Sequence, residues 1–76
     1  MNIGMLWHDD DPQRTLEQKL KRAADYYQSK YGQRPTTCFV NSGIVPVGQS
    51  STVAGLRVQS ARTVLPNHFW LGVESN

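Results

Sequence analysis

Apolar residues along the chain form several short runs and one longer stripe. Residues 1–7 are apolar at both alternating sets of positions, which predicts a strand covered on both faces. Gly4 within this run would let a packing helix come close. Further on, apolar side chains recur at spacings of three and four, which indicates one face of a helix over residues 12–31: Leu16, Leu20, Ala23, Ala24, Tyr27 and Tyr31.

The ends of this helix carry recognisable signals. Asp11 is a possible N-cap, and Pro12 suits the first helical position because the N–H that proline lacks is unpaired there anyway. Thr15 with Gln18 three residues later offers an alternative capping box further along. Gly32 predicts a left-handed stop at the other end.

Three more strands are expected after the helix. Residues 36–41 form the second strand, residues 53–61 the third and residues 68–73 the fourth, in which Phe69 and Leu71 share one face. The small polar residues 48–51 suggest a mobile loop.

These elements predict an α/β (α+β) domain of βαβββ order that spans residues 1–76, with one helix packed on a small mixed sheet of three to four strands. The strand–helix–strand order makes the first two strands parallel. In the simplest topology the third strand returns antiparallel to the second. One sheet face is then left without a helix, and Leu6, Val40 and Trp70 could form an apolar patch there that a partner copy would bury.

Size and composition support self-association. A chain of 76 residues has a thin core, and its single cysteine, Cys38, excludes an internal disulfide. We therefore expect a homo-oligomer or a protein partner. The lone cysteine and the lack of a secretory signal or an apolar run of membrane-spanning length predict a cytoplasmic protein without a membrane partner.

The junction between the first strand and the helix could bind a divalent metal. His8, Asp9, Asp10 and Asp11 lie together in sequence, and carboxylates at a strand end can hold Mg²⁺ or Mn²⁺ for phosphate chemistry. Alternatively, these acidic residues have no role beyond favouring the positive N-terminal end of the helix. His68 would extend the site to a transition metal if its strand lay antiparallel beside the first. The simplest topology instead places His68 at the opposite end of the sheet.

A basic stripe on the helix suggests a different partner. Six of the eight Lys and Arg residues fall between residues 14 and 34, although the net charge is only +2. Such a stripe with an aromatic side chain could follow a phosphate backbone, or it could be a solvated helix face. The candidate nucleic-acid-binding residues are Lys19, Arg22, Tyr26, Lys30 and Arg34.

Three stretches of the chain resemble short bacterial proteins with no assigned function. They are residues 3–7 leading into residues 9–11, residues 31–38, and residues 65–73. The resemblance implies a bacterial or mobile-element origin and assigns no catalytic residue.

Taken together, the sequence favours a non-catalytic protein-interaction module or assembly subunit that needs no cofactor. A nucleic-acid-binding accessory protein is the alternative reading. A metal-dependent enzyme of phosphate chemistry, centred on residues 9–11, is the third, but a chain of this size would need a subunit interface to form a substrate pocket.

Overall fold

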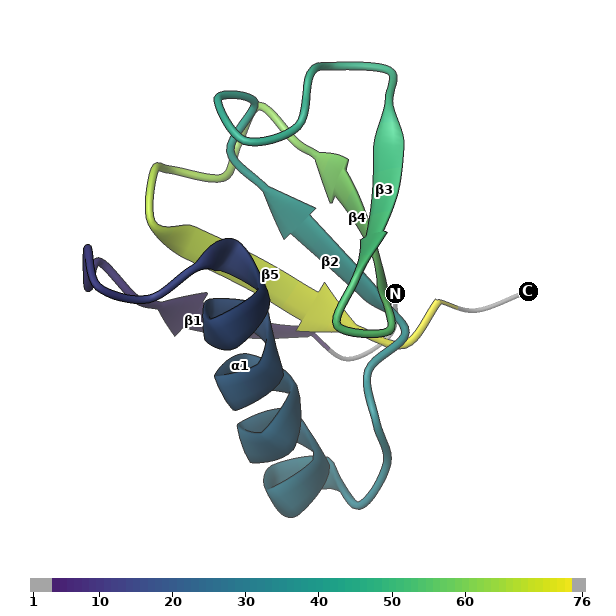
Figure 1. The fold of residues 1–76 in the computed structure, drawn as a ribbon. Coiled ribbons are helices and arrows are strands. Elements are labelled where there is room, and N and C mark those ends of the chain that lie inside the picture. The colour runs from purple at the N-terminus through teal and green to yellow at the C-terminus, as the bar shows by residue number, and fades with distance from the viewer. Residues whose placement is uncertain (1–3, 75–76) are drawn as a thin grey trace.

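The computed structural model describes residues 4–74 and contains one helix and five strands in that range. The strands lie side by side in the order β1-β5-β2-β4-β3, and the helix crosses one face of the sheet (Figure 1). The expected α+β class with one helix on a mixed sheet is confirmed, with more strands than predicted. In chain order the elements are β1 (Gly4–His8), α1 (Leu16–Tyr31), β2 (Thr37–Val40), β3 (Ser50–Val53), β4 (Leu56–Ser60) and β5 (His68–Gly72).

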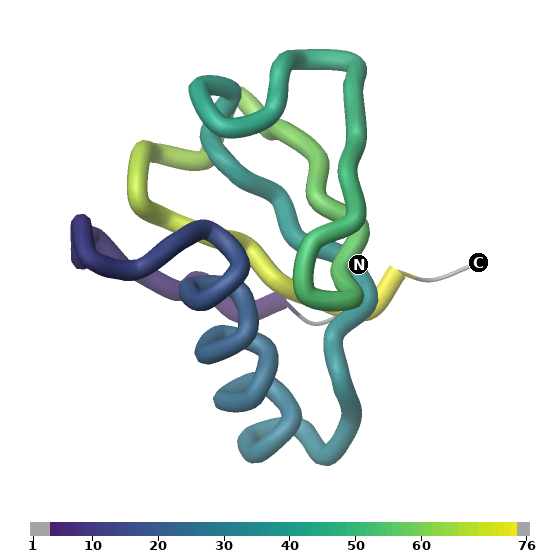
Figure 2. The backbone as a smooth tube through the Cα atoms, in the orientation of Figure 1, coloured from purple at the N-terminus to yellow at the C-terminus, as the bar shows by residue number. Residues whose placement is uncertain are grey.

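The last strand lies between the first two strands of the chain. β5 pairs antiparallel with β1 on one side and with β2 on the other, so β1 and β2 run in the same direction without touching. The path of the chain through this arrangement is visible in Figure 2. β4 pairs parallel with β2, so the expected antiparallel return of the third strand is wrong.

The helix begins later than residue 12. Thr15 accepts a hydrogen bond from the Gln18 backbone N–H at 3.2 Å, and the Gln18 side chain accepts one from Thr15 N–H at 2.9 Å. This capping box, the later of the two predicted starts, satisfies two otherwise unpaired N–H groups. Asp11 instead accepts from Gln13 N–H, within the turn before the helix. Gly32 ends the helix in the left-handed conformation with φ of 78°, as predicted.

A hairpin replaces the predicted loop and long third strand. β3 and β4 pair antiparallel, joined by Ala54 and Gly55, whose φ angles of 52° and 77° suit a tight two-residue turn. The expectation of a mobile loop over residues 48–51 is therefore wrong for its last two residues. β3 is a polar edge strand with exposed serines, so no apolar alternation marked it in the sequence.

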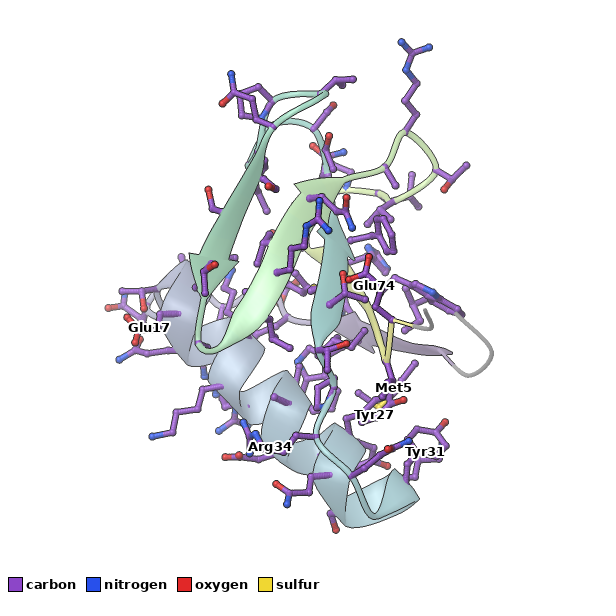
Figure 3. All side chains as sticks on the ribbon, turned by 90° about the vertical axis from the view of Figure 1, so that its right-hand side faces the viewer. Met5, Glu17, Tyr27, Tyr31, Arg34 and Glu74 are labelled. Carbon is purple, nitrogen blue, oxygen red and sulfur yellow. The ribbon has the colours of Figure 1, made fainter. Side chains whose placement is uncertain are left out.

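The hydrophobic core lies between the helix and the sheet face that it covers. Figure 3 shows Met5 of β1 beside Tyr27 near the end of α1. Val40 is fully buried in this core, so its expected place on the uncovered face with Leu6 and Trp70 is wrong. Side chains alternate along a strand, and in β2 Cys38 and Val40 point to the helix while Phe39 points away. The core residues are Met5, Leu20, Ala23, Ala24, Tyr27, Cys38, Val40, Val45, Leu56, Val58, Phe69 and Leu71.

Gly4 makes room for an aromatic ring and not for the helix as expected. A Cβ atom at this position would lie 2.2 Å from Cζ2 of Trp70, which is far too close for two carbon atoms. Gly4 and Trp70 lie on the sheet face that points away from the helix. The Trp70 indole can therefore pack this closely against β1 only because Gly4 has no side chain.

The substitution Gly4→Ala tests this contact. The added methyl group should push the Trp70 ring off β1 and lower the free energy of unfolding by about 1–3 kcal/mol. In a Trp7→Phe background the fluorescence reports Trp70 alone, and its emission should shift. An unchanged spectrum together with unchanged urea unfolding would contradict the packing described.

Candidate functional site

The candidate site lies on the face of the sheet that points away from α1, which we call the open face. A groove with a volume of about 520 Å³ crosses this face. It combines residues of three strands with the loop between β4 and β5. Its lining consists of Leu6, Phe39, Ala61, Thr63, Val64, Leu65, His68 and Trp70.

Three strands place the large side chains of the groove in one row. Trp70 of β5 lies opposite Leu6 of β1 on one side and opposite Phe39 of β2 on the other. The side chains of Leu6 and Trp70 remain 57% and 37% exposed, although both are large and apolar. Two of the three predicted interface residues therefore lie side by side on the open face. Phe39 was missed, although the alternation in its strand pointed to it.

The loop after β4 forms one wall of the groove. Asn41, at the end of β2, donates a hydrogen bond from Nδ2 to the Val64 carbonyl at 3.0 Å. Ala61 N–H also donates to the Val40 carbonyl, which ties the start of the loop to the same strand. Val64 is buried at 8% exposure, so the wall is anchored by packing as well. No local pattern in the sequence revealed this long-range contact.

His8 and His68 lie together at one end of the open face. They are directly opposite each other in the β1–β5 register, and their ring centroids are 4.7 Å apart with a tilt of 39°. The simplest topology, which placed them at opposite ends of the sheet, is wrong because β5 lies beside β1 and runs antiparallel to it. His68 Nδ1 lies 2.8 Å from the Pro66 carbonyl oxygen. Since a carbonyl can only accept, Nδ1 carries the proton and Nε2 is left as the ring's potential ligand atom.

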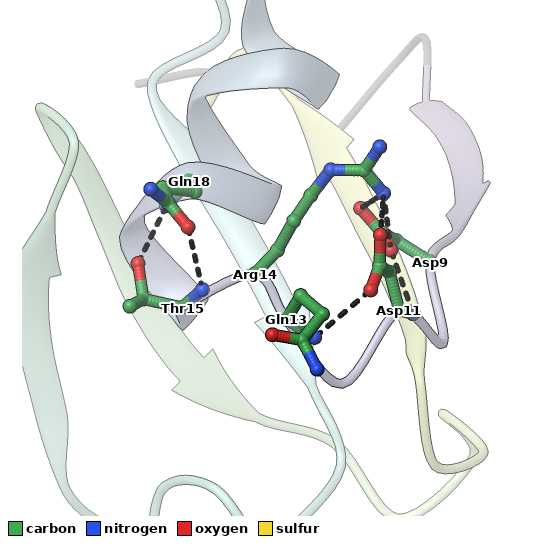
Figure 4. A network of polar contacts seen from close by, with 6 residues as sticks. All are labelled: Asp9, Asp11, Gln13, Arg14, Thr15 and Gln18. Atoms are coloured by element: carbon green, nitrogen blue, oxygen red, sulfur yellow. Dashed lines mark hydrogen bonds and ion pairs between the residues drawn. The ribbon is translucent and has the colours of Figure 1, made fainter.

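The neighbouring aspartates belong to a different network, shown in Figure 4. Asp9 is 7% exposed and accepts hydrogen bonds from Asp11 N–H at 3.0 Å and from the Arg14 guanidinium at 3.2 Å. Arg14 also forms an ion pair with Asp11 at 3.1 Å. Sequence reasoning missed this role of Arg14, which holds two carboxylates at the junction.

This network sets the protonation state of Asp9. Burial by itself would raise the pKa of the Asp9 carboxyl, but the Asp11 N–H and the positive charges of Arg14 and Lys19 outweigh it and hold the pKa below 3.8. Asp9 is therefore a stabilised carboxylate whose oxygens already accept hydrogen bonds from the protein. Within residues 4–74, no group of three or more His, Cys, Asp and Glu side chains could hold a metal ion. Neither Asp9 nor Asp10 thus completes a metal site with the two histidines.

Two cations of the basic stripe and its aromatic residue have contacts within the fold. Arg34, labelled in Figure 3, donates to Gln28 Oε1 at 2.9 Å and pairs with Asp25 at 3.4 Å. Lys30 Nζ lies 5.4 Å from the centre of the Tyr31 ring, and the Tyr26 ring packs against that of Trp7 with a tilt of 45° and a centroid distance of 5.2 Å.

Two further cations of the stripe differ in their surroundings. The positive charge of Lys19 helps to lower the pKa of Asp9. Arg22 lines a hollow together with Arg14 and Lys21. The stripe therefore does not form one continuous row of free cations.

Cys38 cannot serve as a nucleophile in this fold. It lies in the core, and burial raises the pKa of its thiol to about 12. A thiol with this pKa is protonated at neutral pH, whereas the reactive species is the thiolate.

In comparisons with protein families, curated proteins and solved structures, nothing matches this chain. The helix of the described region, residues 4–74, is neither long nor apolar enough to cross a membrane. The site must therefore be interpreted from its own geometry.

The Asp9 network predicts a pH dependence of stability. The pKa of Asp9 is lower in the folded state than its ordinary value of 3.8. The stabilisation of the fold by the Asp9 carboxylate is therefore fully present above the ordinary pKa and is lost as the pH falls through the folded pKa. Asp9→Asn should lower the free energy of unfolding by about 1.5 kcal/mol at pH 7. The difference from the unmodified protein should shrink steadily below the ordinary pKa.

Urea unfolding at a series of pH values measures this difference. Asp10→Asn is the matched control, because Asp10 is exposed and should have little effect at any pH. A loss of stability in Asp9→Asn that stays constant down to the acid limit would contradict the charge-based account.

Proposed function

We propose that this chain is a non-catalytic interaction module that self-associates through the open face of its sheet. The observation that carries the proposal is the exposed pair of Leu6 and Trp70, which lie on neighbouring strands and line the groove. Exposed apolar patches of this kind, with polar surroundings, mark interaction sites on soluble proteins.

The chemistry of the groove favours a protein surface as its occupant. Its lining contains no Lys, Arg, Asp or Glu, and apart from Thr63 and His68 its side chains are apolar. Tryptophan is also among the residues that contribute most to binding when a partner buries them. A second copy of the chain presents the same apolar surface, so the two faces are complementary without any unpaired charge.

The molecule has little depth for a second apolar layer of its own. Two of its three principal extents are 30 Å and the third is 19 Å. The thin one-helix core would gain a second apolar layer from this contact. The single buried thiol, Cys38, fits a reducing compartment such as the cytoplasm.

The alternative functions have weaker support. A nucleic-acid backbone needs free cations beside the stacking surface, and Arg57 on the open face forms an ion pair with Glu74 at 3.6 Å. Metal-dependent phosphate chemistry needs open carboxylates, and Asp9 and Asp11 are both bound to Arg14.

Analytical ultracentrifugation of the purified chain tests the proposal. The unmodified protein should sediment as a dimer at micromolar concentration. Trp70→Ser and Leu6→Ser should each weaken the dimer, Trp70→Ser by about 2 kcal/mol or roughly thirtyfold. Two variants are used because Trp70 also packs on Gly4, whereas the Leu6 side chain is more exposed.

Val47→Ser is the matched control, since Val47 is 60% exposed but does not line the groove. It should leave the dimer unchanged. A monomeric unmodified protein, or a dimer that neither groove variant weakens, would overturn the proposal. Binding of single-stranded RNA that quenches Trp70 fluorescence in the monomer would favour the nucleic-acid alternative instead.

A further inference from the structure

We propose that His8 and His68 form one half of a zinc site that a second copy of the chain completes, so that one Zn²⁺ bridges the two open faces. The inference rests on the proposed self-association through the same face. It makes the two histidines zinc ligands and the end of the open face that carries them a second contact between the two copies.

The two imidazoles are positioned by the backbone and not by chance contact of flexible side chains. Both project from paired strands at the same register position, and their centroids lie 4.7 Å apart. Imidazole nitrogens bind Zn²⁺ at about 2.0–2.1 Å, so two rings on one ion must be close neighbours. Cross-strand pairing supplies this proximity before any metal binds, which lowers the entropic cost of assembling the site.

The second observation is the hydrogen bond from His68 Nδ1 to the Pro66 carbonyl at 2.8 Å. Histidines that bind metals typically donate their other ring N–H to a carbonyl or carboxylate, which fixes the tautomer and the ring orientation. In the neutral ring this contact leaves the lone pair on Nε2, where a metal ion can bind. His68 also lines the groove, so this ring belongs to the same surface as the apolar contact.

Two histidines from one chain provide only half of a tetrahedral site. Within the described residues 4–74, no carboxylate or thiol joins the pair. Asp9, the nearest acid in sequence, is turned to Arg14, and Cys38 lies in the core. The two missing ligands must therefore come from water or from another molecule, and a second copy supplies two more histidines of the same kind.

A single symmetry axis satisfies both contacts. Leu6 and His8 lie on β1, and Trp70 and His68 lie opposite them on β5, so the apolar pair and the histidine pair follow the same two strands. A two-fold axis between the facing sheets, parallel to β1 and β5, lays β1 of one copy over β5 of the other, so the two sheets overlap along these two strands. It would place Trp70 near its own copy and the four histidines around one point.

The experiment measures zinc binding and association together. Isothermal titration of the unmodified protein with Zn²⁺ should give one ion per two chains. Ultracentrifugation with free Zn²⁺ at about ten times its dissociation constant should show a dimer about tenfold tighter than in EDTA. Co²⁺ in place of Zn²⁺ should give the visible absorption of a four-coordinate ion.

His8→Gln is the main variant because His8 is exposed at the end of its strand. It should abolish the zinc effect but leave the dimer in EDTA unchanged, and thermal unfolding in EDTA checks that it folds. His68→Gln should do the same. Trp70→Ser is the matched contrast, because it should weaken the dimer in EDTA while zinc still tightens it.

The outcomes separate this inference from the proposed function. A dimer that forms in EDTA but does not respond to Zn²⁺ overturns the zinc site and leaves the self-association standing. One Zn²⁺ per chain without association also overturns the bridging site. A protein that stays monomeric with and without Zn²⁺ overturns both, and a zinc effect that persists in His8→Gln assigns the metal to other residues.

Discussion

The two-sided backbone pairing of β5 is the constraint on which the rest of the structure depends. The last strand of the chain hydrogen-bonds to β1 along one edge and to β2 along the other, so it joins the two strands that flank the helix. Without it, the helix would connect two strands that have no partner in common. The same pairing brings His68 beside His8, and Trp70 between Leu6 and Phe39. The histidine pair and the row of Leu6, Trp70 and Phe39 are therefore consequences of one strand insertion.

A single helix can cover only one side of this sheet. In β4 and β5 the apolar side chains that point to the helix are buried, whereas Arg57 and Trp70 between them are exposed on the other face. In a larger α/β domain a second layer of helices would cover that other face. Here the open face leaves a large aromatic side chain, Trp70, 37% exposed, packed against Gly4 and bordered by a wall that Asn41 holds in place. This imbalance between the two faces is the physical basis of the proposed association.

At the acidic junction before the helix, internal contacts occupy carboxylates that could otherwise bind a metal ion. Asp9 and Asp11 share one arginine, and Asp9 also accepts a backbone N–H. This pairing satisfies a buried carboxylate that would be costly without partners. His8 precedes these residues directly but points to the opposite side of the sheet. The alternation of a single strand thus separates an internal ion-pair network from a surface histidine pair.

The sequence alone determined the features that depend on neighbours close in the chain. The apolar period and the stop at Gly32 identified the helix, with Asp11 and Thr15 as alternative starts, and alternation identified the core face of β5, because these signals act within a few residues. Leu6 and Trp70 were likewise placed on the uncovered face. Only the tertiary structure decided the strand order, the β3–β4 hairpin, the burial of Val40 and the meeting of His8 with His68. Strand pairing joins residues far apart in the chain, and no local pattern records which edge the last strand will choose.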